Sequence, residues 1–144
     1  MSRPFRFGVV APVLTDVASW RDQLRRLADS GYSTVLMPDV PQWQPAPGPT
    51  LAMAAAWTNL RVGTWVYASP LRPAWSTAWE AHSLSLLTEG RFEMGIGTGR
   101  PGIEDEHDLA NGPGKRTRAL DIGSRFNGRA LCASRELYLA APQL

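Results

Sequence analysis

The stretch Arg91-Phe92-Glu93-Met94-Gly95-Ile96-Gly97-Thr98-Gly99-Arg100 decides the fold of this chain. Apolar residues alternate along its first half, as they do in a strand with one face against a core. The strand runs directly into a turn with two glycines, which lets a ligand approach the backbone. We therefore expect a strand over Phe92 to Ile96 whose C-terminal end borders a binding site.

The residues before this stretch alternate strand signals with helix signals. Runs of strand-forming residues predict strands over Phe5 to Val10, Thr34 to Met37 and Leu60 to Tyr67. We expect helices between them, one N-capped by Ser19, one N-capped by Thr50 and one that begins at Pro73. Strands and helices in this order, joined by right-handed crossovers, form a parallel sheet covered by helices.

The C-terminal ends of parallel strands all lie on one rim, and barrels of this kind carry their chemistry there. The residues that follow the predicted strands are therefore the candidate ligand contacts. They are Ala11 and Pro12, Pro38 to Trp43, Ala68 to Arg72, and Gly97 to Arg100.

The chain resembles the luciferase-like flavin and deazaflavin oxidoreductases over residues 3–102. The resemblance rests on Phe5 to Pro12, Gly31 to Asp39, Leu60 to Leu71 and Arg91 to Gly99. Members of that family are complete eight-stranded barrels, which take roughly 250 residues. This chain has 144 residues, so the resemblance implies the N-terminal half of a TIM-type (β/α)8 barrel with about four parallel strands. We expect a half-barrel domain over 1–102 and a divergent, irregular tail over 103–144.

The resemblance also implies a cofactor, either FMN or the deazaflavin coenzyme F-420, and a small-molecule substrate. Asp39 matches an acidic residue near the ring and substrate in many members and is the expected catalytic residue. The next position is often His in the family but is Val40 here, which removes a candidate proton donor. Trp43 is expected in the substrate wall. From the residues alone, Asp39 could equally terminate a strand while Trp43 packs on the loop.

The expected cofactor contacts follow the third and fourth strands. Many family members carry a non-proline cis peptide under the ring, and the equivalent bond here is Trp65–Val66. The resemblance implies cofactor binding by Trp65, Val66, Ala68, Ser69, Gly97, Thr98 and Gly99.

Two other interpretations remain open. Residues 97–102 fit G-x-G-x-x-G, the fingerprint of a dinucleotide-binding α/β module, but the acidic run Glu104 to Asp108 that follows would repel a pyrophosphate. The chain can also be a non-catalytic half-barrel remnant with a structural or interaction role. Cofactor binding distinguishes the enzyme from the remnant.

Composition excludes several classes. The 44% hydrophobic content is enough for a core, and no apolar run reaches the length of a membrane span. We therefore expect a cytoplasmic protein. Cys132 is the single cysteine and has no zinc-like spacing to His82 or His107, so no metal site is expected. The net charge of +2 makes nucleic acid an improbable partner.

The tail and the sheet edges yield two further expectations. From Asn111 onward the pattern is irregular, with at most one short helix over Leu131 to Leu139. A four-stranded half barrel leaves two strand edges and one apolar sheet face open, and both favour association. We expect a homo-oligomer formed through the exposed sheet edges.

Overall fold

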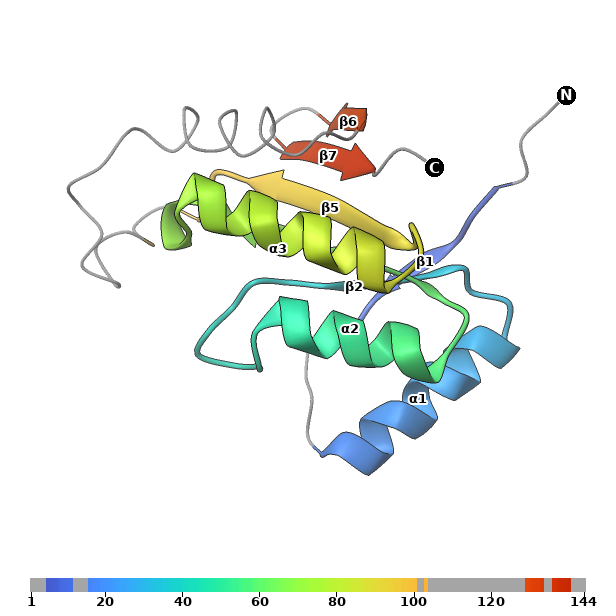
Figure 1. The fold of residues 1–144 in the computed structure, drawn as a ribbon. Helices are drawn as coiled ribbons and strands as arrows, with labels where there is room; N and C mark the ends of the chain where they lie inside the picture. The colour runs from blue at the N-terminus through green and yellow to red at the C-terminus, as the bar shows by residue number, and fades with distance from the viewer. Residues whose placement is uncertain (1–4, 12–15, 101–102, 104–128, 134–135, 141–144) are drawn as a thin grey trace, which may run out of the picture.

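The computed structural model describes residues 5–11, 16–100, 103, 129–133 and 136–140 (Figure 1). In chain order the elements are β1 (Gly8–Val10), α1 (Val17–Asp29), β2 (Thr34–Met37), α2 (Pro47–Trp57), β3 (Arg61–Thr64), β4 (Tyr67–Ala68), a 3-10 turn η1 (Ser69–Leu71), α3 (Ala74–Leu87), β5 (Phe92–Gly97), β6 (Arg129–Ala133) and β7 (Glu136–Ala140).

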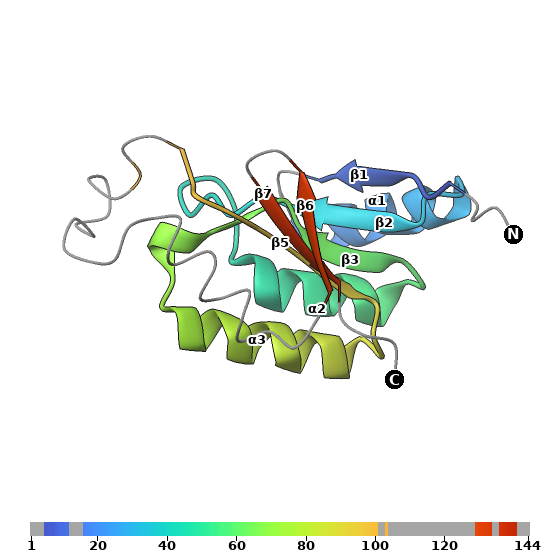
Figure 2. The same cartoon turned by 90° about the horizontal axis from the view of Figure 1, so that it is seen from above.

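Strands β1 to β5 form a parallel sheet. Strand β1 pairs with β2, β2 with β3, and β5 pairs with both β3 and β4. Helices α1, α2 and α3 lie on one face of this sheet (Figures 1 and 2). The predicted fold class is therefore confirmed, an α/β half barrel of parallel strands with flanking helices.

The hydrophobic core lies between the sheet and the helices. Alternate residues of β2 and β5 supply the sheet side, including Met37, Phe92 and Met94, and all three are almost fully buried. Leu24 of α1 and Leu51 of α2 supply the helix side and are fully buried. The alternation seen in the sequence thus gives β5 its buried face.

Helix α1 begins earlier than predicted. Its N-cap is Asp16, whose Oδ1 accepts a hydrogen bond from the Ser19 backbone N–H at 2.8 Å. This bond lowers the pKa of the Asp16 carboxyl below its usual range. The prediction that Ser19 caps the helix is wrong, because the carboxylate three residues before it already satisfies a free amide of the first turn.

Helices α2 and α3 also differ from prediction at their starts. Thr50 lies inside α2, where its hydroxyl donates to the Ala46 carbonyl at 2.8 Å, and Pro47 occupies the first helical position. Pro73 precedes α3 as its N-cap residue. In both helices a proline with a preset backbone angle determines the start without a side-chain cap.

The predicted third strand is interrupted where it faces β5. Gly63 pairs with Glu93 and Tyr67 pairs with Ile96, so three residues of one strand face two of the other. The Trp65–Val66 peptide bond within this bulge is cis, as the resemblance implied. The Thr64 hydroxyl donates to the Gly95 carbonyl at 2.7 Å and accepts from the Gly95 N–H at 3.0 Å. Thr64 thereby replaces the missing backbone pairing, and β4 is redirected along the end of β5.

The tail contains an antiparallel pair instead of a helix. Strand β7 pairs antiparallel with β5, and β6 pairs antiparallel with β7. The short helix considered over Leu131 to Leu139 is wrong at the described positions, because pairing with β5 supplies backbone partners that local propensity does not reveal. Strand β5 is therefore paired on both sides. Among strands β1 to β5, the remaining free edge is that of β1, and association through a sheet edge stays a prediction for that strand.

Several sequence predictions fall outside the described residues. They include Pro12, Gly102, the acidic run with His107, and the residues from Asn111 to Gly128. Among the helices that the structure describes, none combines the length and apolar character needed to cross a membrane.

The close approach of β3 and β5 predicts different tolerances at two strand glycines. A Cβ at Gly63 would lie 2.5 Å from the Glu93 carbonyl oxygen, whereas a Cβ at Gly8 would meet nothing closer than 3.5 Å. We expect Gly63→Ala to lower the free energy of unfolding by about 1–3 kcal/mol through overpacking. Gly8→Ala should change it by less than about 0.5 kcal/mol. Urea denaturation measures both, and equal costs would contradict the described packing.

Candidate active site

Three segments meet at the C-terminal rim of the sheet. The Ala68 backbone N–H donates to Asp39 Oδ2 at 3.2 Å, which joins the loop after β2 to β4. The Trp65 N–H donates to the Met37 carbonyl at 2.8 Å, and Ala68 pairs with Gly97 at the end of β5. The structure therefore brings the predicted residues after three strands into one place.

Arg72 holds the Asp39 carboxylate through two hydrogen bonds. Its Nε lies 2.9 Å from Oδ2 and its Nη2 lies 3.1 Å from Oδ1. The Asp39 side chain is only 4% exposed. Both carboxylate oxygens are thus engaged by this bidentate pair, and the arrangement supports a positioning role for Asp39 at the rim.

The network continues from Arg72 into α3. Arg72 Nη1 donates to Glu80 Oε2 at 3.1 Å, and the Tyr67 hydroxyl donates to Glu80 Oε1 at 2.9 Å. The Arg72 guanidinium also lies 4.3 Å from the centre of the Tyr67 ring. A Cβ at Gly48 would lie 1.7 Å from Glu80 Oε1, so α2 packs directly against this carboxylate. The network connects the rim to both helices.

The protonation states of this network favour positioning over proton transfer. Burial raises the pKa of the Tyr67 phenol far above its usual range, and the Glu80 charge raises it further. Burial alone would lower the pKa of Arg72, but hydrogen bonds from Arg72 to Asp39 and the Asp39 charge raise it overall. Tyr67 therefore remains a donor and Arg72 remains a cation at neutral pH.

The predicted cofactor contacts differ in accessibility. Trp65 is 42% exposed, and Val66, Thr98 and Gly99 are partly exposed. Trp43, the predicted substrate contact, is 73% exposed on the connection after β2. These residues are accessible to solvent.

Ala68, Ser69 and Gly97 are buried. They shape the rim through their backbone. Direct contact between the Ala68 or Ser69 side chain and a ligand is thus less favoured than the sequence suggested.

The turn after β5 packs against η1. Gly99 adopts a φ of +72°, and a Cβ there would lie 3.0 Å from Ile103 Cγ2 and 3.5 Å from the Pro70 ring. Glycine is required here by backbone conformation and by space. The turn is consequently a fixed wall of the rim.

The rim residues fit a planar ring with polar edges, as flavins and deazaflavins have. Trp65 and Val66 offer apolar surface, and the turn at Thr98 and Gly99 is partly exposed. Gln44 lies buried on the connection after β2, where its Nε2 donates to the Pro38 carbonyl and its Oε1 has no hydrogen-bond partner among the described residues.

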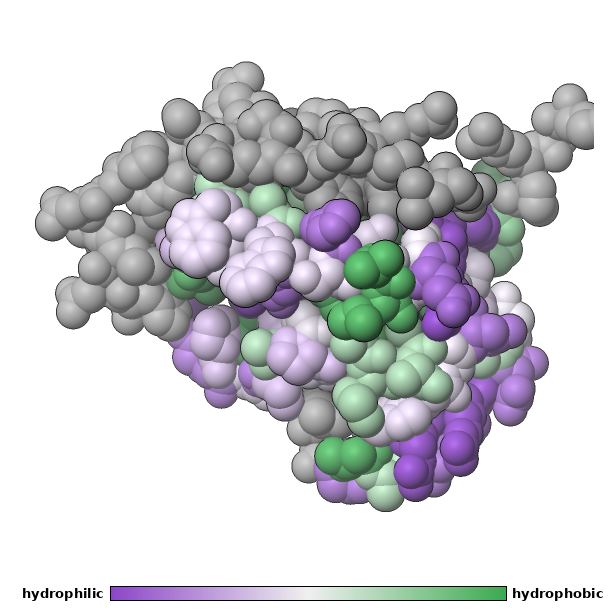
Figure 3. All heavy atoms as spheres, viewed as in Figure 1, coloured by the Kyte–Doolittle hydropathy of each residue, from purple (hydrophilic) through white to green (hydrophobic). Residues whose placement is uncertain are grey.

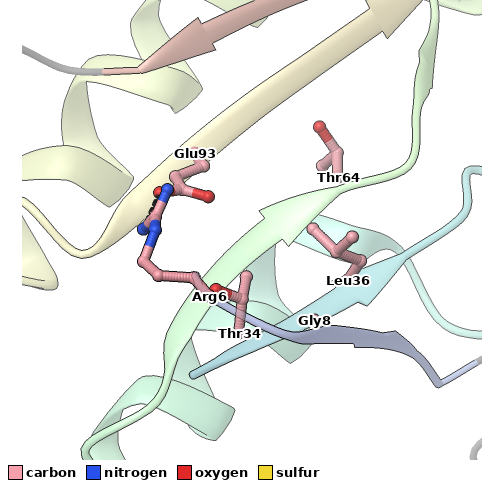
Figure 4. A pocket seen from close by; sticks show the side chains of 6 residues that line it. All are labelled: Arg6, Gly8, Thr34, Leu36, Thr64 and Glu93. Atoms are coloured by element: carbon pink, nitrogen blue, oxygen red, sulfur yellow. Dashed lines mark hydrogen bonds and ion pairs between the residues drawn. The ribbon is translucent and has the colours of Figure 1, made fainter. Parts of the chain in front are cut away.

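A hollow lies on the sheet face opposite the helices. It encloses about 170 Å³ and is lined by Arg6, Gly8, Thr34, Leu36, Thr64 and Glu93 (Figure 4). Glu93 Oε1 accepts from Arg6 Nη1 and from Arg61 Nε, each at 2.7 Å. The expectation that this face is apolar is wrong at these positions, because an ion cluster occupies the start of the strands.

Sequence reasoning missed the partners of Asp39. Arg72 was within a predicted rim segment, but its pairing with a residue 33 positions away had no local signal. Glu80 lies on a helix outside all predicted rim segments, and only the fold brings it to Arg72. Among the described residues no group of three or more His, Cys, Asp or Glu side chains is placed to bind a metal.

Comparisons with known proteins agree with the fold. Residues 4–121 match the family model for luciferase-like monooxygenases. One similar solved structure is the oxygenating constituent of 3,6-diketocamphane monooxygenase from the CAM plasmid of Pseudomonas putida, a type II Baeyer-Villiger monooxygenase in complex with FMN. Its TM-score is 0.66 at 17% identity, over 96% of this chain and 44% of that chain.

Another similar structure is coenzyme F420-dependent tetrahydromethanopterin reductase from Methanopyrus kandleri. Its TM-score is 0.61 at 22% identity, over 72% of this chain and 30% of that chain. Identities at this level show a shared fold, and the chain spans less than half the length of either structure. A search of the curated proteins finds no match.

The buried Asp39–Arg72 pair predicts a large cost when one partner is removed. Arg72→Met should lower the free energy of unfolding by about 3–5 kcal/mol, because it leaves the Asp39 carboxylate buried without a cation. Adding Asp39→Asn should recover part of that loss. The matched control is Arg25→Met, which breaks an exposed pair with Asp22 at 3.8 Å and should cost less than about 1 kcal/mol. Similar costs for the two arginines in urea denaturation would contradict the network.

Tyr67 predicts a loss of stability at alkaline pH. The folded-state pKa of Tyr67 lies above the unfolded value of 10.0. The contribution of its phenol to the free energy of unfolding is therefore complete below about pH 10 and is lost as the pH rises further. Tyr67→Phe should lower stability at pH 8 by about 1.5–3 kcal/mol through loss of the bond to Glu80, and should flatten the fall between about pH 9 and pH 11. Tyr32→Phe, at a residue that is 39% exposed, should retain the wild-type pH dependence. A Tyr67→Phe profile parallel to wild type would refute the assignment.

Proposed function

This chain belongs to the luciferase-like monooxygenase family, and on that premise we propose that its rim binds FMN or coenzyme F-420 and carries oxidoreductase or monooxygenase chemistry on a small-molecule substrate. The observation that supports this most is the convergence of Asp39 after β2, Ala68 at the end of β4 and Gly97 at the end of β5. Two enzymes of similar fold use these cofactors by their descriptions, one FMN and the other F420.

The protein's part in this chemistry is to bind and orient. A bound flavin or deazaflavin supplies the redox step itself, so the chain needs no protein nucleophile. Trp65, Val66, Thr98 and Gly99 would hold the ring at the rim. Trp43, on the neighbouring connection, would contact the substrate.

Asp39 acts in this proposal by fixing the rim. With both oxygens bound to Arg72 and Ala68, it holds β4 against the loop that carries Trp43. Val40 has no group that transfers a proton, so a proton required at the substrate comes from elsewhere. The catalytic role predicted for Asp39 thus becomes a positioning role, and activity should still depend on it.

We expect the isolated 144-residue chain to bind cofactor weakly and to turn over slowly. It spans 44% and 30% of the two similar structures, so a ring at this rim has fewer protein contacts than in those proteins. A misplacement of about 1 Å can cost roughly a hundredfold in rate. A cytoplasmic location stays a prediction.

Cofactor titration of two glycine variants tests the proposal. Gly99 and Gly90 both have positive φ, +72° and +75°, but Gly99 lies after β5 at the rim and Gly90 lies before β5 at the opposite end. We expect Gly99→Val to weaken FMN or F-420 binding at least about tenfold, a change of about 1.4 kcal/mol. Gly90→Val carries comparable backbone strain, although its Cβ meets no atom within 4 Å whereas that of Gly99→Val meets Ile103, and it should leave the affinity of the folded protein unchanged.

Equal effects of the two variants would remove the turn from the site. The absence of saturable binding of both cofactors by the wild-type chain would contradict the proposed function and favour the non-catalytic half barrel.

A further inference from the structure

The sheet face opposite the helices carries a hollow of about 170 Å³ (Figure 4). Successive side chains of a strand point to opposite faces of a sheet. Met37 of β2 is buried in the core, and its neighbour Leu36 lines the hollow on the other face. On the helix side, Figure 3 shows pale and green spheres, the colours of intermediate and hydrophobic residues, gathered over α2 and α3. The hollow differs from that surface, because it combines charged groups with an apolar wall.

The end of the hollow at the strand starts is charged. Arg6 precedes β1, Arg61 is the first residue of β3 and Glu93 is the second residue of β5. Both guanidiniums bind one carboxylate oxygen, since Arg6 Nη1 and Arg61 Nε each lie 2.7 Å from Glu93 Oε1. Two cations and one anion leave a net formal charge of +1. The Arg6 side chain is 53% exposed and that of Arg61 is 22% exposed, so Arg6 is the more accessible cation.

The two arginines differ in how far the protein already engages them. Arg61 is held by a further bond, from Nη2 to the Gly90 carbonyl at 3.1 Å. The bond described for Arg6 comes from Nη1. Nε and Nη2 form the edge through which a guanidinium binds a carboxylate by two parallel hydrogen bonds, and Arg72 binds Asp39 through that edge in this molecule. The same edge of Arg6 is suited to a second carboxylate.

The other end of the hollow is apolar. Figure 4 shows Arg6 and Glu93 joined at one end, with Leu36 and Thr64 away from them. The Thr64 hydroxyl is already bonded to the backbone of β5, which leaves Leu36 as the main wall. Gly8 lines the hollow without a side chain, and a Cβ there would meet nothing closer than 3.5 Å. A ligand that extends from Arg6 therefore passes from charge to apolar surface.

We propose that this hollow binds a small monocarboxylic acid with an apolar body about the size of a benzene ring. The carboxylate would bind the Nε–Nη2 edge of Arg6, and the apolar body would lie over Gly8 against Leu36. A single negative charge matches the net formal charge of the ion cluster. A cavity of about 150 Å³ accommodates benzene, and the hollow encloses about 170 Å³.

Other ligand classes fit less well. Inorganic phosphate would place additional negative charge near Glu93 and would leave the apolar wall unused. A neutral aromatic compound would leave the Nε–Nη2 edge of Arg6 without an acceptor. Binding of the acid would not require a cofactor at the rim.

Titration of the ¹⁵N-labelled 144-residue chain with benzoate, in the absence of flavin, tests this proposal. We expect saturable shifts at the amides of Gly8, Thr34 and Leu36, with a dissociation constant on the order of 1 mM or below. Benzamide has the ring without the charge, and acetate has the charge without the ring. Benzamide, acetate and phosphate should each bind at least about tenfold more weakly than benzoate.

Two substitutions in the hollow locate the site. Arg6→Gln should weaken benzoate binding at least about tenfold, because it removes the cation. Gly8→Leu should abolish binding by filling the hollow. The matched control is Arg25→Gln on α1, which removes an arginine whose side chain is 58% exposed and should leave the dissociation constant within about twofold of wild type. The dispersion of the amide spectra shows whether each variant retains the fold.

Several results would overturn the proposal. One is the absence of saturable benzoate binding by wild type up to about 20 mM. Equal affinity for benzoate and benzamide, or for benzoate and phosphate, would reject the proposed ligand class. An unchanged affinity in Arg6→Gln, or an equal loss in Arg25→Gln, would reject the site, and this comparison decides the question if Gly8→Leu does not fold. Shifts confined to Thr98 and Gly99 would place benzoate at the rim and would equally reject the hollow.

Discussion

The bidentate ion pair between Arg72 and Asp39 is the constraint on which the geometry of the rim depends. One guanidinium binds a carboxylate after β2 and a carboxylate on α3, while the Asp39 carboxylate also accepts the backbone N–H of β4. These charged groups are buried or partly buried, so each needs hydrogen-bond partners for the arrangement to be favourable. The arrangement connects a loop, a strand and a helix that are far apart in sequence. Their relative positions are what a ligand at the rim would meet.

The bulge between β3 and β4 supplies the second condition. Because three residues face two at this point, β4 cannot continue straight along β5. Thr64 closes the gap with two hydrogen bonds to Gly95, and Gly63 allows the strands to approach closely. The redirected β4 places the Ala68 N–H where Asp39 can accept it. The bulge between β3 and β4 thus determines the position of the rim.

Sequence patterns predicted the sheet better than the helix ends or the site partners. The apolar run at Thr34 to Met37 coincides with β2 because a fully buried strand leaves a continuous signal. The start of α1 was missed because Asp16 and Ser19 are both good N-caps, and only the three-dimensional contact distinguishes them. The pairing of Asp39 with Arg72 and Glu80 depends on long-range packing, which no periodicity in one sequence records.

The sequence pattern grouped the large residues of α3 on one face but did not predict that this face is exposed, and the reason is physical. Helical spacing groups Trp75, Trp79 and Leu86 on one face, but spacing alone does not say whether that face meets the core or solvent. Small residues such as Ala78 and Ala81 let α3 approach the sheet closely, and the large residues are left outside. The exposure of the large residues is therefore a property of the fold that the sequence pattern leaves open.

We propose that the rim built on Asp39 and Arg72 binds a flavin-type ring. Backbone amide spectra of the ¹⁵N-labelled chain, recorded during titration with FMN and separately with F-420, test it most directly. We expect the largest shifts at the amides of Trp65, Val66, Ala68, Thr98 and Gly99 with at least one cofactor. It would be contradicted by saturable shifts confined to the Arg6–Glu93 hollow or to the outer face of α3, or by unchanged spectra with both cofactors.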